Sequence, residues 1–356
     1  MSGLELPVDA PALPQVIKGR HYTSSHRGLE LVDAIYQDCH FDQLTWSECR
    51  LSNLRFVNCR FDANRFECCE LTSLIYEDCH LASTKWTDCM LRGLSFIGGE
   101  IGGAMWAGGL IKDTTFSKTN ASDWRFDSVR TAHLSVVTSE LTDIVISGGR
   151  WSDASWVALQ LVGVNMHSVE LENFVVGHSG CHRFTLEACQ GINVRWIDSK
   201  IDRMTVTDCE LQQAAWSRCT WSDGQINSSR LPIASFDQST VSNLSIRNSE
   251  LPQAIFDHAS VFDSDLHGLK APRVGFRHTR LVRVQLAGAQ LHGLDARGAT
   301  LEQVGLNGCD CRNGCLIGQP RRAWLAADTR QATFDEAAAE DDGPWRHRTQ
   351  PGARGV

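Results

Sequence analysis

The chain has 356 residues, of which 21% are charged and 42% hydrophobic, and its formal net charge is −8. This balance argues against non-specific nucleic-acid binding, which requires a basic surface. No apolar run approaches the ~20 residues of a membrane span, and no basic region precedes an apolar segment at the N-terminus, so we expect a soluble cytoplasmic protein without a signal peptide.

The first 30 residues lie before any repeat and carry Pro7, Pro11 and Pro14. A chain built from stacked rungs exposes unpaired backbone groups at its ends, which would pair with other chains unless they are covered. We therefore expect residues 1–30 to form an irregular N-terminal cap.

A strict repeat occupies the middle of the chain. From Leu31 to Leu316 every fifth residue is apolar, with exceptions only at Thr131 and Gly191. A helix buries residues at a period near 3.6 and a strand at a period of 2, so a period of five fits neither. It requires a chain that turns a corner every five residues, and it makes residues 31–316 one repeat array.

A second inward series lies two residues before each apolar centre and alternates small with larger residues at a period of ten. A longer period of twenty is also visible, and it indicates four five-residue sides per turn. The residues that recur at this spacing are Pro232, Pro252 and Pro272, followed by Phe236, Phe256 and Phe276. The prolines indicate a corner at which a fixed φ is useful and the missing N–H costs little.

With an apolar centre and a small residue two positions before it, residues 31–316 resemble the pentapeptide-repeat family. The resemblance implies an all-β fold, a right-handed quadrilateral β-helix solenoid of about fourteen rungs and roughly 70 Å in length. Eight of the eleven tryptophans take the central position, which departs from the family pattern. The repeat is least regular between residues 115 and 200, where we expect any bulge or kink. The residues responsible are Trp124, Thr131, Phe174, Phe184 and Gly191.

The segment after Pro320 predicts a short helix that presents Trp324, Leu325 and Phe334. We expect residues 317–340 to form a helical C-terminal cap. Residues 341–356 are polar and rich in Gly and Pro, so we expect them to be disordered.

The 14 cysteines follow the phase of the repeat. Most occupy the small inward position, which predicts small buried hydrophobes and not disulfides. One inward column contains Cys39, Cys59 and Cys79, and another contains Cys49, Cys69 and Cys89. The group Cys309, Cys311 and Cys315 lacks the C-x-x-C spacing of zinc sites, so we expect no metal site and no cofactor.

Sequence signatures of catalysis are also lacking. The chain contains no P-loop, G-x-G-x-x-G, H-E-x-x-H or G-x-S-x-G pattern. A convex rod offers no obvious cleft in which a nucleophile, a base and an orienting group would converge. We therefore expect no catalytic residues and a non-enzymatic protein.

Candidate partner-binding residues form one apolar stripe. The residue after the centre is apolar at Ile97, Val137, Val157 and Ile197, all in phase modulo twenty, and Val175 precedes a centre on the same side. Rungs stack about 4.8 Å apart, so these side chains would form an exposed stripe of the kind that marks interaction sites. Shielding of the stripe by a local loop is the open alternative.

Three functions remain open at this point. The first is a cytoplasmic protein-binding scaffold that occludes its partner, because Cys- and Trp-rich pentapeptide-repeat chains resemble immunity or accessory proteins of toxin and type VI secretion clusters. The second is a DNA-mimicking topoisomerase (gyrase) protection protein, and the third is a secreted effector. The second requires a continuous acidic face, which mixed signs at positions 50, 70, 130, 150 and 170 disfavour.

All three functions involve a protein partner, either a toxin, an effector or a topoisomerase. None of them requires direct binding to nucleic acid or to a membrane. The chain is expected to be a monomer or a dimer through the C-terminal helix.

Overall fold

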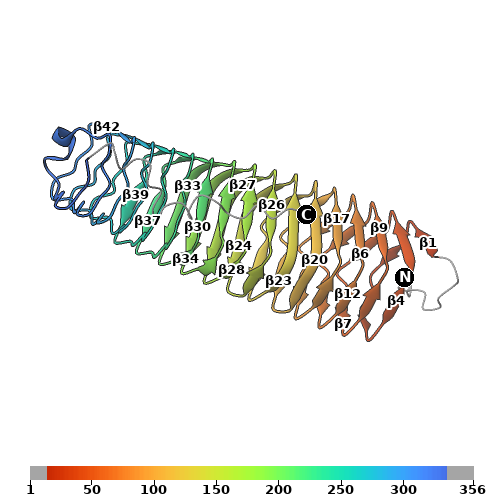
Figure 1. The fold of residues 1–356 in the computed structure, drawn as a ribbon. Helices are drawn as coiled ribbons and strands as arrows, with labels where there is room; N and C mark the ends of the chain where they lie inside the picture. The colour runs from red at the N-terminus through yellow and green to blue at the C-terminus, as the bar shows by residue number, and fades with distance from the viewer. Residues whose placement is uncertain (1–13, 335–356) are drawn as a thin grey trace.

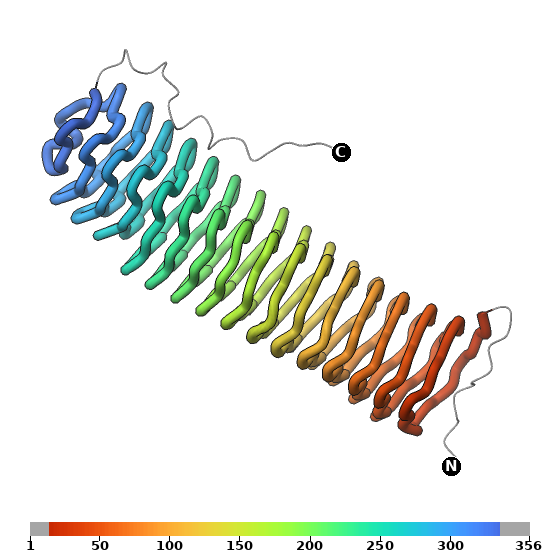
Figure 2. Tube along the Cα trace, turned by 60° about the horizontal axis from the view of Figure 1, so that its bottom comes forward, coloured from red at the N-terminus to blue at the C-terminus, as the bar shows by residue number. Residues whose placement is uncertain are grey.

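Residues 14–334 are described by a computed structural model of the chain. They form one long rod of stacked rungs, and the rungs follow each other in chain order from one end to the other (Figures 1 and 2). All strand pairs are parallel, and from β3 (His26–Arg27) onward the paired residues lie twenty apart along the rod, as in Phe41↔Phe61 and Leu71↔Leu91. Four short sides therefore complete one rung, and the predicted four-sided all-β solenoid is confirmed.

Stacked strands form four faces. Face 1 contains β4 (Glu30–Val32), β8 (Arg50–Ser52), β12 (Glu70–Thr72), β16 (Met90–Arg92), β25 (Arg150–Ser152), β28 (Glu170–Glu172), β31 (Gln190–Ile192) and β34 (Glu210–Gln212). Face 2 contains β1 (Gln15–Lys18), β5 (Ala34–Gln37), β9 (Arg55–Val57), β13 (Ile75–Glu77), β17 (Ser95–Ile97), β26 (Ser155–Val157), β29 (Val175–Gly177), β32 (Arg195–Ile197) and β35 (Ala215–Ser217).

Faces 3 and 4 complete each rung. Face 3 contains β2 (His21–Tyr22), β6 (His40–Asp42), β10 (Arg60–Asp62), β14 (His80–Ala82), β18 (Glu100–Gly102), β21 (Asn120–Ser122), β36 (Thr220–Ser222), β38 (Thr240–Ser242), β40 (Ser260–Phe262), β41 (Arg280–Val282) and β42 (Thr300–Glu302). Face 4 contains β3 (His26–Arg27), β7 (Thr45–Ser47), β11 (Arg65–Glu67), β15 (Lys85–Thr87), β19 (Met105–Ala107), β22 (Arg125–Asp127), β37 (Gln225–Asn227) and β39 (Ser245–Arg247).

Six longer strands turn a corner and contribute to two faces each. Faces 1 and 2 share β20 (Leu110–Ser117) and β23 (Arg130–Val137). Faces 3 and 4 share β24 (Glu140–Ser147), β27 (Gln160–His167), β30 (Gly180–Glu187) and β33 (Lys200–Thr207).

Backbone geometry explains the period of five. In most quintets the centre and the residue two positions before it are buried, as in Phe56 and Leu54, while the neighbours of the centre point outward. Every fifth residue from Gly28 to Gly318 has a positive φ, and these residues form the corners. Gly, Asn and Asp occupy many of the corners because they adopt the left-handed conformation at low energy.

The corner at Ile233 provides a stability prediction. A β-branched side chain strongly disfavours the left-handed region, and Ile233 has φ 59°. Asn fills the equivalent corner at Asn173 and Asn193, so Ile233→Asn should raise the free energy of unfolding by about 1 kcal/mol. Denaturation in urea measures the change.

Ile192→Asn is the matched control, because Ile192 also lies outward but outside a corner. It should bring no gain. An equal gain in both variants would show that polarity, and not the backbone conformation, is responsible.

Aromatic rings stack along the interior of the rod. The column Tyr36, Phe56, Tyr76, Phe96 and Phe116 has successive centroid distances of 5.3, 5.0, 4.6 and 4.5 Å. Near-parallel rings at this spacing add to the burial of apolar area.

The cysteines behave as predicted. All 14 are free, and all but Cys68 and Cys315 are buried. Their thiols donate to backbone carbonyls, as Cys59 does to the oxygens of Tyr36 and Val57 at 3.3 and 3.4 Å.

The expected bulge or kink between residues 115 and 200 is absent from the strand register. The twenty-residue offset continues without a break through β20, β23, β24, β27, β30 and β33. Large side chains are accommodated by tilting, since Trp124 packs at 57° to Phe116 and at 72° to Trp106. At Gly191 the backbone itself approaches the preceding rung, and an added Cβ would lie 2.4 Å from the oxygen of Leu171.

Both ends of the rod differ from the expected boundaries. The first rung begins at Gln15, because β1, β2 and β3 already pair with β5, β6 and β7 inside the segment expected to be an irregular cap. At the C-terminus, the predicted helix is only a 3-10 turn, η1 (Arg321–Trp324). The cap expected at residues 1–13, the helix expected at 335–340 and the disorder expected at 341–356 concern residues outside the described part of the chain.

The C-terminal segment extends the ladder after this turn. Asp328 bridges to Asp310 and Thr333 to Cys315, at an offset of eighteen. Residues 326–333 therefore continue the ladder through isolated bridges and turns, because the unpaired amides and carbonyls of the rung below hold them there, and this outweighs their helical propensity. Trp324 is buried, but Leu325 is 83% exposed, so only part of the predicted apolar set covers the core.

Candidate protein-binding face

The structure brings the predicted stripe together on face 2. Ile97, Val137, Val157 and Ile197 lie in one outward column, in which Ser117 separates the first two and Gly177 the last two. Val175 lies in the second outward column of the same face, between Ser155 and Arg195. We call these five apolar residues the apolar stripe.

The apolar stripe is less exposed to solvent than expected. Ile97 is the most exposed of its five residues, at 43%, and Val137, Val157, Val175 and Ile197 are half-buried. Gly177 has no side chain and leaves a notch beside Val157. Contact with the stripe therefore requires a surface that follows the sheet closely.

The sequence reasoning missed the second outward column as a whole. Beside the stripe this column carries short hydroxyl side chains, which we call the hydroxyl column: Ser95, Thr115, Ser135 and Ser155. Between residues 95 and 217, Arg195 is the one charged residue in the two outward columns of face 2. Reading both flanks of each centre at a spacing of twenty would have revealed this uncharged area.

The other faces carry charges that pair between rungs. On face 1, Arg50 lies 3.8 Å from Glu70, Arg150 lies 3.3 Å from Glu170, and Arg230 lies 3.2 Å from Glu210. Lys270 and Glu250 repeat this pairing at 3.2 Å. The acidic side chains of these four pairs are thus neutralised by bases of adjacent rungs, which interrupts an acidic surface along the described part of face 1.

A buried ion network lies on face 2 toward the C-terminus. Asp257 and Asp295 are almost fully buried. Arg277 lies 2.6 Å from Asp257, and Arg297 lies 2.7 Å from Asp295. Each carboxylate therefore has a guanidinium partner, which buried charges require.

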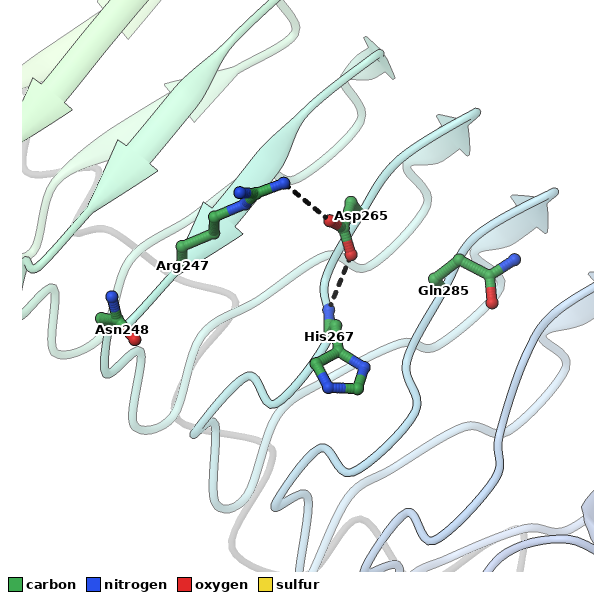
Figure 3. A pocket seen from close by; sticks show the side chains of 5 residues that line it. All are labelled: Arg247, Asn248, Asp265, His267 and Gln285. Atoms are coloured by element: carbon green, nitrogen blue, oxygen red, sulfur yellow. Dashed lines mark hydrogen bonds and ion pairs between the residues drawn. The ribbon is translucent and has the colours of Figure 1, made fainter.

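An open hollow on face 4 is lined by Arg247, Asn248, Asp265, His267 and Gln285 (Figure 3). Asp265 accepts hydrogen bonds from the Arg247 side chain at 3.4 Å and from the His267 backbone N–H at 3.2 Å. The lining contains no serine, threonine or cysteine that a base could activate. Covalent catalysis by such a nucleophile therefore has no basis in this hollow.

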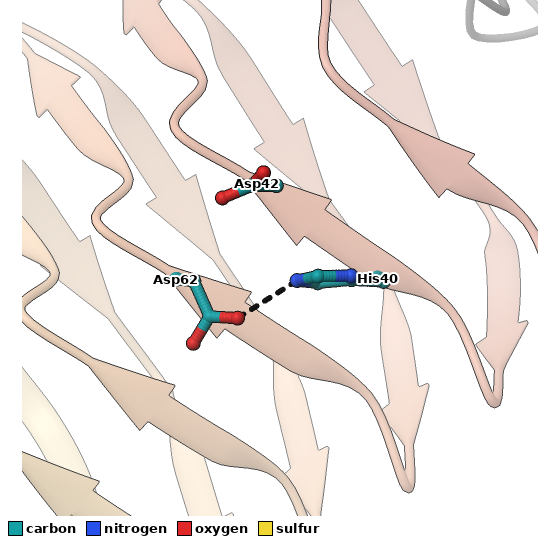
Figure 4. Close-up of side chains that lie close together, drawn as sticks. All are labelled: His40, Asp42 and Asp62. Carbon is teal, nitrogen blue, oxygen red and sulfur yellow. Dashed lines mark hydrogen bonds and ion pairs between the residues drawn. The ribbon is translucent and has the colours of Figure 1, made fainter.

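His40, Asp42 and Asp62 converge on face 3 from β6 and β10 (Figure 4). His40 Nε2 lies 2.8 Å from Asp62 Oδ2. This group contains the donor types that bind divalent metal ions. The sequence reasoning missed it because its members come from both outward columns and from two rungs.

The one helical turn between residues 14 and 334 is far too short to span a membrane.

A family model described as "Pentapeptide repeat region" matches residues 29–106. No curated protein matches the chain. Similar solved structures include the pentapeptide repeat protein Rfr23 from the cyanobacterium Cyanothece 51142, with 17% identity over 37% of this chain and 91% of that chain and a TM-score of 0.28.

QnrB1, a plasmid-mediated fluoroquinolone resistance protein, is 17% identical over 52% of this chain and 95% of that chain, with a TM-score of 0.26. HetL, a pentapeptide repeat protein involved in heterocyst differentiation regulation from the cyanobacterium Nostoc sp. strain PCC 7120, is 15% identical over 60% of this chain and 88% of that chain, with a TM-score of 0.21. Residues 29–106 are thus similar to a pentapeptide-repeat region, and the same five-residue geometry continues through the later rungs of the solenoid.

Proposed function

We propose that the chain is a non-enzymatic protein-binding scaffold that occludes a protein partner through face 2, between β17 and β35. The observation that carries this proposal is the uncharged area formed by the apolar stripe and the hydroxyl column. Over the same rungs the other faces carry several charged side chains, such as Arg150 and Glu170 on face 1. An uncharged area costs less to dehydrate than a charged one, so face 2 suits a broad contact.

The width of the stripe limits the kind of contact. A stable protein interface buries about 800 Å² on each partner, which exceeds what five partly exposed aliphatic side chains offer. The partner must therefore also contact the hydroxyl column and the corner residues beside it. Such an interface has an apolar centre and a polar rim, the usual arrangement in protein complexes.

The finer proposal is an immunity or accessory protein of a bacterial toxin or type VI secretion cluster, acting in the cytoplasm. Its support is the family resemblance of a Cys- and Trp-rich repeat rod, together with a rigid face that could cover an active site or a substrate path. The partner would be a single toxin or effector.

Protection of a topoisomerase by DNA mimicry is the alternative. It requires unpaired acidic side chains along one face, and the ion pairs between rungs on face 1 disfavour it. A gyrase supercoiling assay with the purified protein distinguishes the two functions, because the occluding scaffold should leave supercoiling and its inhibition by a fluoroquinolone unchanged.

Val157→Asp should abolish partner capture without unfolding the rod. The new carboxylate would lie in the middle of the apolar stripe and would have to lose its water on binding, so we expect a loss in affinity of at least about tenfold, or 1.4 kcal/mol. Capture from the native cell identifies the partner, and titration with that purified partner measures the affinity.

Val162→Asp is the matched control, because Val162 is a partly exposed valine on face 3, in register with Thr142 and His182. It should bind as the parent does. Equal affinity of the folded Val157→Asp variant and the parent would reject face 2 as the binding site.

A further inference from the structure

We propose that His40, Asp42 and Asp62 form a binding site for a divalent transition-metal ion on face 3, near the N-terminal end of the rod. His40 and Asp42 flank the buried Phe41 in β6, so both side chains point outward. Asp62 is the register partner of Asp42 on the next rung. The ladder itself therefore places one imidazole and two carboxylates side by side (Figure 4).

The donor atoms are close enough for a shared ion. One ligand atom from each of the three residues lies within 4.8 Å of the other two, and His40 Nε2 is 2.8 Å from Asp62 Oδ2. Donors on a tetrahedral zinc ion lie 2.0–2.1 Å from the metal, or roughly 3.3 Å from one another. Rotation of the Asp42 side chain can thus bring the third donor to coordination distance, since His40 and Asp62 are already directed toward each other.

The charges at the site favour a cation. Asp42 and Asp62 are like charges on adjacent rungs, an arrangement that is destabilising without a counter-charge. Asp62 accepts hydrogen bonds from His40 and Arg60. Within residues 14–334, the Asp42 side chain has neither a hydrogen bond nor an ion pair, so its carboxylate is available as a ligand.

The donor set selects the class of metal. A nitrogen donor with two carboxylates suits zinc and similar transition-metal ions, whereas Mg²⁺ and Ca²⁺ prefer oxygen ligands alone. The ring of His21 stacks on His40, with centroids 4.6 Å apart and planes at 5°. This stacking restricts the tilt of the His40 imidazole.

A second His–Asp pair on the same face provides an internal control. His182 Nδ1 lies 2.6 Å from Asp202 Oδ2, and the two residues pair between rungs. In place of a second carboxylate, the neighbouring outward positions carry Val162 and Ser222. The His–Asp pair alone is thus a feature of the ladder, and Asp42 distinguishes the proposed site.

Isothermal titration with Zn²⁺ tests the site, using the full chain with the exposed thiol removed by Cys68→Ser. We expect saturable binding that weakens at least about tenfold on Asp42→Asn or His40→Gln and is unchanged on Asp202→Asn. Arg60→Ala should tighten binding, because the guanidinium competes with the metal for Asp62. Circular dichroism confirms that each variant remains folded.

A zinc titration without saturable binding would overturn the proposal, and so would Asp42→Asn binding with the affinity of its parent. Equal weakening by Asp202→Asn and Asp42→Asn would also overturn it, because binding would then follow any His–Asp pair. Competition by Mg²⁺ at equal concentration would contradict the assigned class of metal.

Discussion

Replacing Phe56 with alanine should lower the free energy of unfolding by about 3–5 kcal/mol. The ring is buried between Tyr36 and Tyr76, with centroids 5.3 and 5.0 Å away, and meets Phe41 and Phe61 edge-on. The cavity cannot close by collapse, because the backbone ladder fixes the distance between rungs. Urea denaturation followed by circular dichroism measures the loss.

The effect of Phe56→Ala should be visible in the shape of the transition as well. Each rung contacts only its neighbours, so stability is a sum of local terms along the rod. A cavity near the N-terminal end should let residues before Phe56 unfold at lower denaturant than the rest, which gives a broader or two-step curve.

Val57→Ala is the matched control, because Val57 is the next residue but points outward from face 2. It should change stability by no more than about 0.5 kcal/mol. Similar losses in the two variants would contradict the assignment of Phe56 to a stacked interior column.

The five-residue period was sufficient to predict the fold. A centre such as Phe56 or Leu71 has a partner twenty residues later in the ladder, so sequence spacing translates directly into spatial contact. The prolines at positions 232, 252 and 272 were also placed correctly, because each precedes a residue with positive φ at a corner.

The ends of the rod could not be predicted from the period, because the chain there follows a different register. Gln15 pairs with Ala34 at an offset of nineteen, and Asp328 pairs with Asp310 at eighteen. In these segments backbone hydrogen bonding to the last regular rung decides the conformation. Helical propensity after Pro320 was therefore a poor guide beyond the single turn η1.

The position of the apolar stripe could be predicted from the sequence, but the burial of its side chains could not. Phase alone placed Val137 and Val157 in one column, and the register confirms their adjacency. Their partial burial depends on the neighbouring side chains, which a one-dimensional pattern does not describe. The group of His40, Asp42 and Asp62 required reading two columns and two rungs together.

Raising the pH above 9 should destabilise the rod steeply, because buried thiols resist ionisation. Burial raises the pKa of Cys181 from its ordinary value of 9.0 to about 12, with a further contribution from the nearby Cys219. Burial likewise raises the pKa of Cys219 to about 11. In the unfolded chain both thiols are exposed to water and ionise near 9.

Proton release from the unfolded chain determines how the free energy of unfolding changes with pH. Above pH 9 the unfolded chain releases thiol protons that the folded chain retains, so the unfolded state binds fewer protons and the free energy of unfolding falls as pH rises. The stability is complete below pH 9 and is lost as the pH approaches 11–12. At pH 10.5 each thiol should lower the free energy of unfolding by about 2 kcal/mol, which makes about 4 kcal/mol for the pair.

Urea denaturation at pH 8.0, 9.5 and 10.5 measures this dependence, and the double variant Cys181→Ala and Cys219→Ser isolates the two thiols. Serine already occupies the position of Cys219 on the adjacent rungs, at Ser199 and Ser239, so the rod should tolerate the change. Between pH 8.0 and 10.5 the free energy of unfolding should fall by about 4 kcal/mol less in the double variant than in the parent.

Cys68→Ser is the control, because it removes an exposed thiol and should keep the parent's dependence on pH. If the double variant follows the parent's curve, ionisation of these two thiols is not what limits stability at alkaline pH, and the remaining inward cysteines and the buried tyrosines must account for the loss.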